Sequence, residues 1–419
     1  MAAYLVCLTA DGGVPLFTRT KGNIKPLAFA EVGMLNGVQM FAQNHGVKLQ
    51  STATDEARIA WKVYHESITL IVVICDDGAS DTHLYRLLDN VFHSMVLLVG
   101  LDDIISIKNV ERLKRDLKAC YKLVDTLLEE TEFFGDLTES VDIFLSTENS
   151  LLQEHLESFV HAADSTYGCL CVMDRIAVAT TKWWDLTGQE LVLLSLLLRS
   201  LPQASSRDIA VYLPHSSPKI PHRLLTFQLI HGVEACVLCG PTPTLDDVRD
   251  KLLEVHWKPA LESLRSCIRV FPRNIPLSVE LDLGILGFIL INTDNHRCLA
   301  TMHPNSTDEK QLPHKILSMS RKIGILKTFY KTVVGIYFAP VHSPDKEELT
   351  CDLQALLSHK AKDTYICGDD YKCYALNDDR YQIFVLYGSH VPTFALRTTT
   401  QKTLMTLIKD KKFDEKKKS

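Results

Sequence analysis

One order of predicted elements recurs three times along the chain, and this repetition constrains the fold more than any single motif does. Each copy reads as two strands, a helix, three strands and a closing helix, over roughly 140 residues. Since no sequence identity is evident between the copies, the repeat is one of topology. At roughly 150 residues per domain, a chain of 419 residues should hold about three domains, which agrees with the three copies.

Such an order of elements favours a five-stranded antiparallel sheet flanked by helices. The expected fold class is therefore α+β, with three domains of this kind in one chain. A proline-punctuated linker at 271–276 separates the second copy from the third. The expected domains are residues 1–135, 150–272 and 278–410, followed by a charged tail at 411–419.

Two predicted helices have apolar patterns that bear on how the domains pack. In the first copy, apolar residues recur at steps of three and four, as on one face of a helix, at Leu27, Ala30, Met34, Val38 and Phe41. In the second copy, residues 191–198 are apolar nearly all round, so that helix should be buried on more than one side. Burial within its own domain and burial against another domain or subunit both stay open.

Composition and the lengths of the apolar runs indicate a cytoplasmic protein without a transmembrane segment. The longest apolar runs, at 68–75, 191–198 and 283–291, are shorter than the roughly 18–20 residues that span a bilayer. No Lys or Arg precedes Arg19, so the positive start of a secretory signal is missing. The 12 cysteines lie mostly in apolar runs, which fits reduced, buried thiols. A net charge of −6 argues against nucleic-acid binding, which needs a concentrated basic face.

Motifs that carry covalent chemistry are missing from the sequence. Neither a phosphate loop, a dinucleotide fingerprint nor a nucleophile elbow is present. Cys236 and Cys239 have the spacing of half a zinc site, but no second pair lies nearby in the sequence. Cys169 and Cys171 alternate along a predicted strand, so both thiols should face the same side. We therefore expect no catalytic, cofactor-binding or metal-binding residues, and we interpret the thiols as buried packing.

The adjacent residues Trp183 and Trp184 are candidates for partner binding. Aromatic anchors are enriched in the cores of protein interfaces, and this pair follows the second predicted strand of the middle copy. The alternative is an aromatic plug over the local core. The sequence leaves both interpretations open.

Several long strings, in the same order, resemble the Fuzzy family of planar cell polarity effectors. The resemblance covers most of residues 1–270, and beyond 276 it rests more on topology than on strings. The strings are GVPLF (13–17), LNGVQMF (35–41), ITLIV (68–72), MVLLVG (95–100), NVERLKRDL (109–117), SLLQE (150–154), VYLPHSSPKIPHRLLT (211–226) and LCGPTP (238–243).

This resemblance implies three longin (profilin-like) domains and a defined set of partners. It implies a heterodimer with Inturned, another longin-bearing protein, and membership of the CPLANE assembly with Wdpcp. That pair is similar in architecture to the Mon–Ccz family of guanine-nucleotide exchange factors for Rab GTPases, and a Rab-like GTPase is a further implied partner. The implied roles are planar cell polarity, cilium formation and recruitment of intraflagellar-transport proteins. The implied locations are the cytoplasm, the cytoskeleton and the basal body, with peripheral membrane association through the complex.

The resemblance also assigns the exchange surface to the first helix, which contains LNGVQMF. Asn36, Gln39 and Met40 are then the candidate partner-binding residues, and an ordinary solvated helix surface is the alternative. Nucleotide exchange needs no covalent chemistry, so the chain would be a regulatory subunit and not an enzyme by itself. A non-catalytic scaffold in vesicle trafficking is the competing interpretation.

Overall fold

The computed structural model describes residues 2–75, 80–129, 134–305, 317–338, 361–378 and 380–409. They belong to two compact units. The first unit consists of Met1–Val141 and Glu148–Arg269, and the second of Asp142–Thr147 and Val270–Ser419. The predicted charged tail at 411–419 lies outside the described residues.

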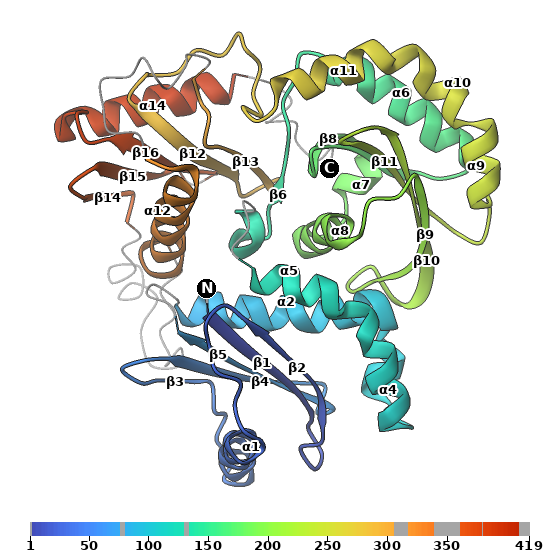
Figure 1. Ribbon diagram of the computed structural model, residues 1–419, viewed down its shortest axis with the longest axis vertical. Coiled ribbons are helices and arrows are strands. Elements are labelled where there is room, and N and C mark those ends of the chain that lie inside the picture. The colour runs from blue at the N-terminus through green and yellow to red at the C-terminus, as the bar shows by residue number, and fades with distance from the viewer. Residues whose placement is uncertain are drawn as a thin grey trace, which may run out of the picture. The chain divides into compact units, whose positions relative to one another are not determined.

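The first sheet has the strand order β2-β1-β5-β4-β3, and all its neighbouring strands are antiparallel. The helices α1 and α2 lie on opposite sides of it (Figure 1). The elements are β1 (Ala2–Thr9), β2 (Pro15–Lys21), α1 (Phe29–Asn44), β3 (Ser51–Ala53), β4 (Arg58–Tyr64), β5 (Ile68–Cys75), α2 (Asp81–Val99), α3 (Leu101–Ile105), α4 (Val110–Asp116), η1 (Leu117–Cys120), α5 (Tyr121–Leu128) and η2 (Gly135–Thr138).

The second sheet repeats this topology with the order β8-β7-β11-β10-β9, again antiparallel throughout. The helix predicted after its last strand is divided into short segments around Pro259, whose ring is incompatible with a helix interior. The elements are α6 (Asn149–Ala162), β7 (Tyr167–Val172), β8 (Arg175–Ala179), α7 (Thr181–Trp184), α8 (Gly188–Ser200), β9 (Ser206–Leu213), β10 (Ser217–Ile230), β11 (Val233–Cys239), α9 (Leu245–Lys251), α10 (Leu253–Trp257), η3 (Lys258–Ala260) and α11 (Leu261–Val270).

The third sheet has the order β14-β15-β16-β12-β13-β6. Without β6 it matches the other two sheets, so the predicted α+β class with three antiparallel sheets is confirmed. The sixth strand was not predicted, and it comes from the segment that joins the first two domains. The elements are β6 (Val141–Asp142), β12 (Ile285–Asn292), β13 (Arg297–Thr301), α12 (Met319–Thr332), η5 (Val333–Tyr337), β14 (Asp363–Cys367), β15 (Tyr371–Asp378), β16 (Tyr381–Gly388), η6 (Thr393–Ala395) and α14 (Leu396–Leu407).

Strand β1 is central in the first sheet, and its side chains supply two separate cores. Because successive side chains of a strand point to opposite faces, alternate residues of β1 enter different clusters. Leu5 and Cys7 join a large core that also contains residues of α2 and α5. Tyr4 and Val6 join a smaller cluster on the other face, where Val32 of α1 covers them. This double burial explains why β1 is apolar at nearly every position.

The larger core continues from the first domain into the second through helix α8. Every residue of α8 from Gly188 to Leu198 is buried, and the helix packs against both α2 and α5. The prediction that residues 191–198 are buried on more than one side is therefore confirmed, with another domain on the second side. This shared core joins the first two domains into one unit. None of the described helices is both long enough and apolar enough to cross a bilayer.

Candidate functional site

Helix α1 is apolar on two sides, which distinguishes it from an ordinary surface helix. Its inner side buries Val32 and Gln39 and packs the half-buried Leu35 against the first sheet. Its outer side exposes five large apolar side chains. They are Phe29 (82% exposed), Met34 (63%), Val38 (48%), Met40 (40%) and Phe41 (65%). A helix that is apolar on both sides normally has both sides covered, whereas the outer side of α1 is exposed in the part of the chain that the structure describes.

The apolar stripe predicted on this helix therefore faces away from the first sheet, whereas a stripe that belongs to the core would face the sheet. The helix at this position is confirmed, but Met34, Val38 and Phe41 face solvent and do not pack on the sheet. Periodicity shows that one side of a helix avoids water, and it does not show what covers that side. We call the five exposed apolar residues of α1 the outer α1 face.

Two glycines widen the outer α1 face. Gly33 and Gly37 are exposed, and a Cβ atom at either position would meet no other atom within 4 Å. They are one helical turn apart, so they lie on the same side of the helix. Glycine in a helix interior costs about 0.5–1 kcal/mol relative to alanine, and the space beside both glycines is open in the described part of the chain. The open backbone would let a partner approach this side of the helix closely.

Charge is nearly missing from α1. The described helix carries one ionisable side chain, Glu31, whose carboxylate accepts a hydrogen bond from the Ala28 backbone N–H at 2.6 Å and so closes the first turn. At the other end, the ring of His45 lies 4.2 Å from that of Phe41 and its Nδ1 is 2.9 Å from the Phe41 carbonyl oxygen. Within α1, the outer α1 face is therefore not bordered by charged side chains that would favour its hydration.

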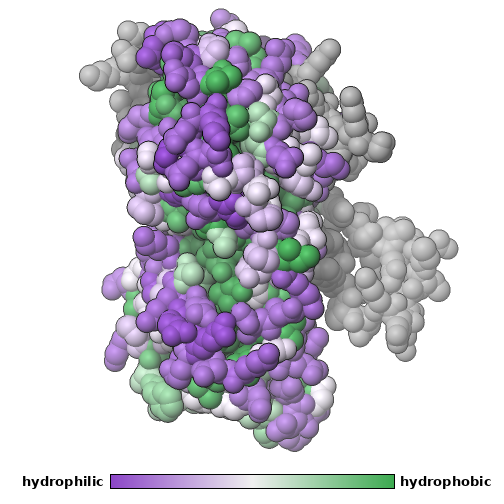
Figure 2. Space-filling view, turned by 90° about the vertical axis from the view of Figure 1, so that its right-hand side faces the viewer, coloured by the Kyte–Doolittle hydropathy of each residue, from purple (hydrophilic) through white to green (hydrophobic). Residues whose placement is uncertain are grey.

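On the face shown in Figure 2, hydrophilic residues predominate and hydrophobic residues gather in smaller groups between them. Single exposed apolar residues such as Val255 of α10, which is 67% exposed, are ordinary on a protein surface. Several on the outer half of one helix mark an interaction surface.

The residues that the sequence proposed on α1 differ in exposure. Met40 is exposed and belongs to the outer α1 face, while Asn36 is half-buried, with its Nδ2 3.3 Å from the Met40 sulfur. Gln39 is only 6% exposed, and its buried Oε1 has no hydrogen-bond donor among the described residues. The remaining members of the face, Phe29, Met34, Val38 and Phe41, were not proposed as binding residues. The signal that could have found them is that α1 has apolar residues on opposite sides.

The two tryptophans lie in the second domain and not near α1 in sequence. Trp183 is 0% exposed and belongs to the large core, with Thr180 capping its short helix α7. Trp184 is half-buried against the same core. The placement of Trp183 matches the aromatic plug of the sequence interpretation. Binding of a partner by any of the five proposed residues stays a prediction.

Thiols converge at one place in the second domain. Cys169 and Cys171 face the same side of β7, with their sulfurs 3.9 Å apart, and Cys236 of β11 joins them. Hydrogen bonds from Cys169 and from Cys236 lower the pKa of Cys171 to about 5. Cys239, the partner of Cys236 in the half-zinc spacing, is not a member of this group. The sequence missed the convergence because it depends on the pairing of two distant strands.

Three family models match the chain in succession. They are described as the first, second and third longin domains of FUZ, MON1 and HPS1, and they match residues 3–127, 163–254 and 284–411. Among curated relatives, a protein fuzzy homolog of Xenopus tropicalis is 46% identical over 98% of both chains. Protein fuzzy homologs of Homo sapiens and Mus musculus are 41% and 39% identical, each over 96% of this chain and 97% of the relative.

Proposed function

Since the chain belongs to the fuzzy protein family, whose members carry three successive longin domains, we propose that it acts in planar cell polarity and ciliogenesis as a regulatory subunit of a larger assembly. The observation that supports this most directly is the outer α1 face, which is apolar and exposed among the described residues. Complete burial of a Val, Met or Phe side chain contributes roughly 1.5–3 kcal/mol relative to exposure. Five such residues on one helix can therefore stabilise a heteromeric contact.

The partner proposed for this contact is Inturned, with Wdpcp as a further subunit of the CPLANE assembly. A longin domain that buries the outer α1 face, including Met40, would also bring the neighbouring Asn36 to the joint surface. In this proposal the pair acts as a guanine-nucleotide exchange factor for a Rab-family or Rab-like GTPase. Binding the nucleotide-free GTPase more tightly than the loaded form lowers the affinity for nucleotide by the same factor, because the two binding events are linked.

The cellular roles proposed with this activity are recruitment of intraflagellar-transport proteins at the basal body and cytoskeletal localisation within the cytoplasm. Membrane contact would be peripheral and through the assembly. The proposed exchange activity requires no covalent step, because it depends on non-covalent binding between protein surfaces. The single helix face that supports the proposal is therefore also the place where it can be tested.

The test combines partner binding with nucleotide release. Met34→Glu and Phe41→Glu each place a charge on the outer α1 face, and both should abolish co-purification with Inturned while leaving the fold intact. Val255→Glu is the matched control, because it introduces the same charge at an equally exposed apolar position of another helix. For the wild-type pair, release of a fluorescent nucleotide from candidate Rab GTPases should be accelerated.

Two outcomes would count against the proposal. If both α1 variants still co-purify with Inturned, the outer α1 face is not the docking surface. In the second outcome, the wild-type chain binds Inturned normally, yet the pair accelerates nucleotide release from none of the candidate GTPases. That result would contradict the proposed exchange activity. In that case the non-catalytic scaffold is the better interpretation.

A further inference from the structure

Three thiols meet on one face of the second sheet, by virtue of strand register. Cys169 and Cys171 are two residues apart on β7, so they point to the same face. Cys236 of β11 is paired directly with Cys169, and Glu234 is paired with Cys171. The three sulfur atoms all lie within 4.8 Å of one another, and all three residues are buried.

One sulfur–sulfur separation matches that of a shared metal ion. A metal–sulfur bond of about 2.3 Å places two ligand sulfurs about 3.8 Å apart in a tetrahedral site and about 4.0 Å apart in a trigonal one. The Cys169 and Cys171 sulfurs are 3.9 Å apart. The Cys236 sulfur lies within 4.8 Å of both, and the three cysteines are free thiols. The pair on β7 is thus spaced for one ion, with the third sulfur within reach.

We propose that Cys169, Cys171 and Cys236 bind a single thiophilic d¹⁰ metal ion in three-sulfur coordination, with Cu(I) as the expected ion. Thiolate ligands select Cu(I), Zn(II) and iron–sulfur clusters. Structural zinc sites are almost always four-coordinate. Among the residues that the structure describes, the ligand group has three members. Three soft ligands therefore favour Cu(I) over zinc.

The residue paired with Cys171 across the two strands is Glu234, whose carboxylate already forms an ion pair. Glu234 forms an ion pair with Arg207 and is mostly buried beside the cluster. Arg207 also donates from Nη1 to Thr226 Oγ1 at 3.1 Å, which fixes the guanidinium in place. Held in this way, Glu234 is a neighbour of the ligands and not a free fourth ligand. A three-coordinate ion would fit without disturbing the Glu234–Arg207 pair.

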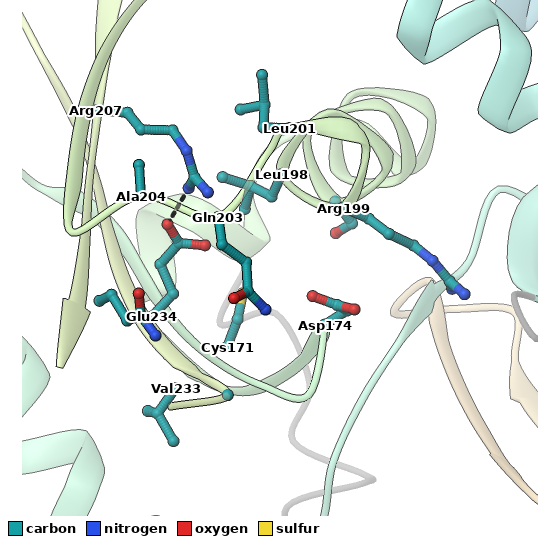
Figure 3. Close-up of a pocket in the computed structure, with 13 residues that line it drawn as sticks. Cys171, Asp174, Leu198, Arg199, Leu201, Gln203, Ala204, Arg207, Val233 and Glu234 are labelled. Carbon is teal, nitrogen blue, oxygen red and sulfur yellow. Dashed lines mark hydrogen bonds and ion pairs between the residues drawn. The ribbon is translucent and has the colours of Figure 1, made fainter. Parts of the chain in front are cut away.

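A pocket lies beside one of the three cysteines. A cavity of about 170 Å³ is lined by Cys171 together with Asp174, Arg207 and Glu234. Figure 3 shows these residues around the pocket, with Arg207 and Glu234 joined by a dashed line. Cys171 is 8% exposed, whereas Cys169 and Cys236 are fully buried. An entry path of this kind is required of a metal site that fills after folding.

The three cluster cysteines are grouped so that each can offer a thiolate to the same ion. Buried cysteines outside the cluster, such as Cys120, lack this arrangement and behave as small apolar side chains. Geometry, ligand type and access therefore agree on one position.

The experiment uses the full-length chain, purified under reducing conditions. Cu(I) is titrated in competition with a chromophoric chelator, and X-ray absorption reports the ligands. We expect one equivalent of Cu(I) with three sulfur neighbours at roughly 2.3 Å. Cys171→Ala and Cys236→Ala should each weaken binding on the order of 100-fold or more. Cys239→Ala is the matched control, since it removes a buried thiol of the same strand outside the cluster, and it should leave the affinity unchanged.

Several results would overturn the proposal. One is binding no tighter than that of a variant with all three cluster cysteines replaced by alanine. A second is an equal loss in Cys239→Ala, which would indicate unspecific thiol binding. A third is tighter binding of zinc(II) with four protein ligands. Should the single variants fail to fold, the stoichiometry and the sulfur count measured on the wild-type chain still decide between these outcomes.

Discussion

Among single residues, Glu190 is the most completely enclosed carboxylate of the second domain. It is 0% exposed and lies in the first turn of α8, where it accepts a hydrogen bond from the Thr187 backbone N–H at 3.1 Å. The backbone N–H groups of His215 and Ser216 donate to it at 2.9 and 2.8 Å. The carboxylate thus ties the start of α8 to the turn between β9 and β10.

Replacing this carboxylate should destabilise the fold and weaken its response to acid. Glu190→Gln removes charge-assisted acceptors from buried donors, so unfolding should become easier by about 1–3 kcal/mol at neutral pH. Burial by itself raises the pKa of Glu190, but hydrogen bonds from Ser216, His215 and Thr187 outweigh it, and the pKa lies below its usual 4.5. The stability from Glu190 is therefore complete above about pH 4.5 and is lost as the pH falls through the lowered pKa.

The measurement is urea unfolding of wild type and Glu190→Gln between pH 7 and pH 3. The two stabilities should converge as the pH falls. Glu254→Gln is the control, because Glu254 is exposed and paired only with Lys258 in the next turn, so its loss should leave stability unchanged. A constant difference between Glu190→Gln and wild type across the range would contradict the assigned pKa direction.

At the scale of elements, α1 offers a matched pair of valines on opposite sides of one helix. Val32 is 7% exposed and packs on the first sheet, whereas Val38 is 48% exposed on the outer α1 face. Val32→Ala should therefore lower the free energy of unfolding by about 1–3 kcal/mol. Val38→Ala should change it by less than about 0.5 kcal/mol. Urea unfolding of the two variants measures this difference. Equal losses of unfolding free energy would mean that the outer α1 face is buried within the chain.

The existence and order of the helices and strands were predictable from the sequence. Which side of each element packs on the core was harder to predict. Ser80 and Thr244 each stand just before an apolar helical pattern, which predicts an N-cap, and both cap their helices through a local hydrogen bond. Ser150 and Gln153 have the spacing of a capping box, but that prediction is wrong, since α6 begins at Asn149 and Ser150 lies inside its first turn. For α1 the pattern located the helix and not its covered side. Local periodicity does not show whether the chain's own sheet or a partner protein covers an apolar helix face.

The same limit applies to the thiol cluster. Alternation along β7 placed Cys169 and Cys171 on one face, which the structure confirms. Cys236 joins them through the pairing of β7 with β11, and that register is set by contacts distant in sequence. Spacing within the sequence pointed instead to Cys239, which lies outside the cluster.

At the scale of the whole chain, the third sheet is completed by a segment that precedes the second domain. The strand β6 and the residues after it lie along β13, where the Ile143 N–H donates to the Cys298 carbonyl oxygen at 2.8 Å. The Leu145 N–H donates in the same way to the Asn274 carbonyl oxygen at 3.1 Å. An uncovered edge strand offers its backbone groups to other chains, so this segment protects β13 from such pairing. Order along the chain gives no sign of it, because each copy already has its five strands.

This covering of β13 leads to a prediction at the scale of the whole chain. Ile143→Pro removes the N–H that bonds to Cys298, and both residues are buried, so the second unit should lose about 1–3 kcal/mol of stability. Ile143→Val keeps the N–H and should have the smaller effect of a lost methylene, about 0.5–1.5 kcal/mol. Hydrogen exchange followed by mass spectrometry checks this, with peptides of β1 as the internal reference. Amides of β12 and β13 should exchange faster in Ile143→Pro than in Ile143→Val. Unchanged protection of β13 would mean that the sheet is stable without its sixth strand.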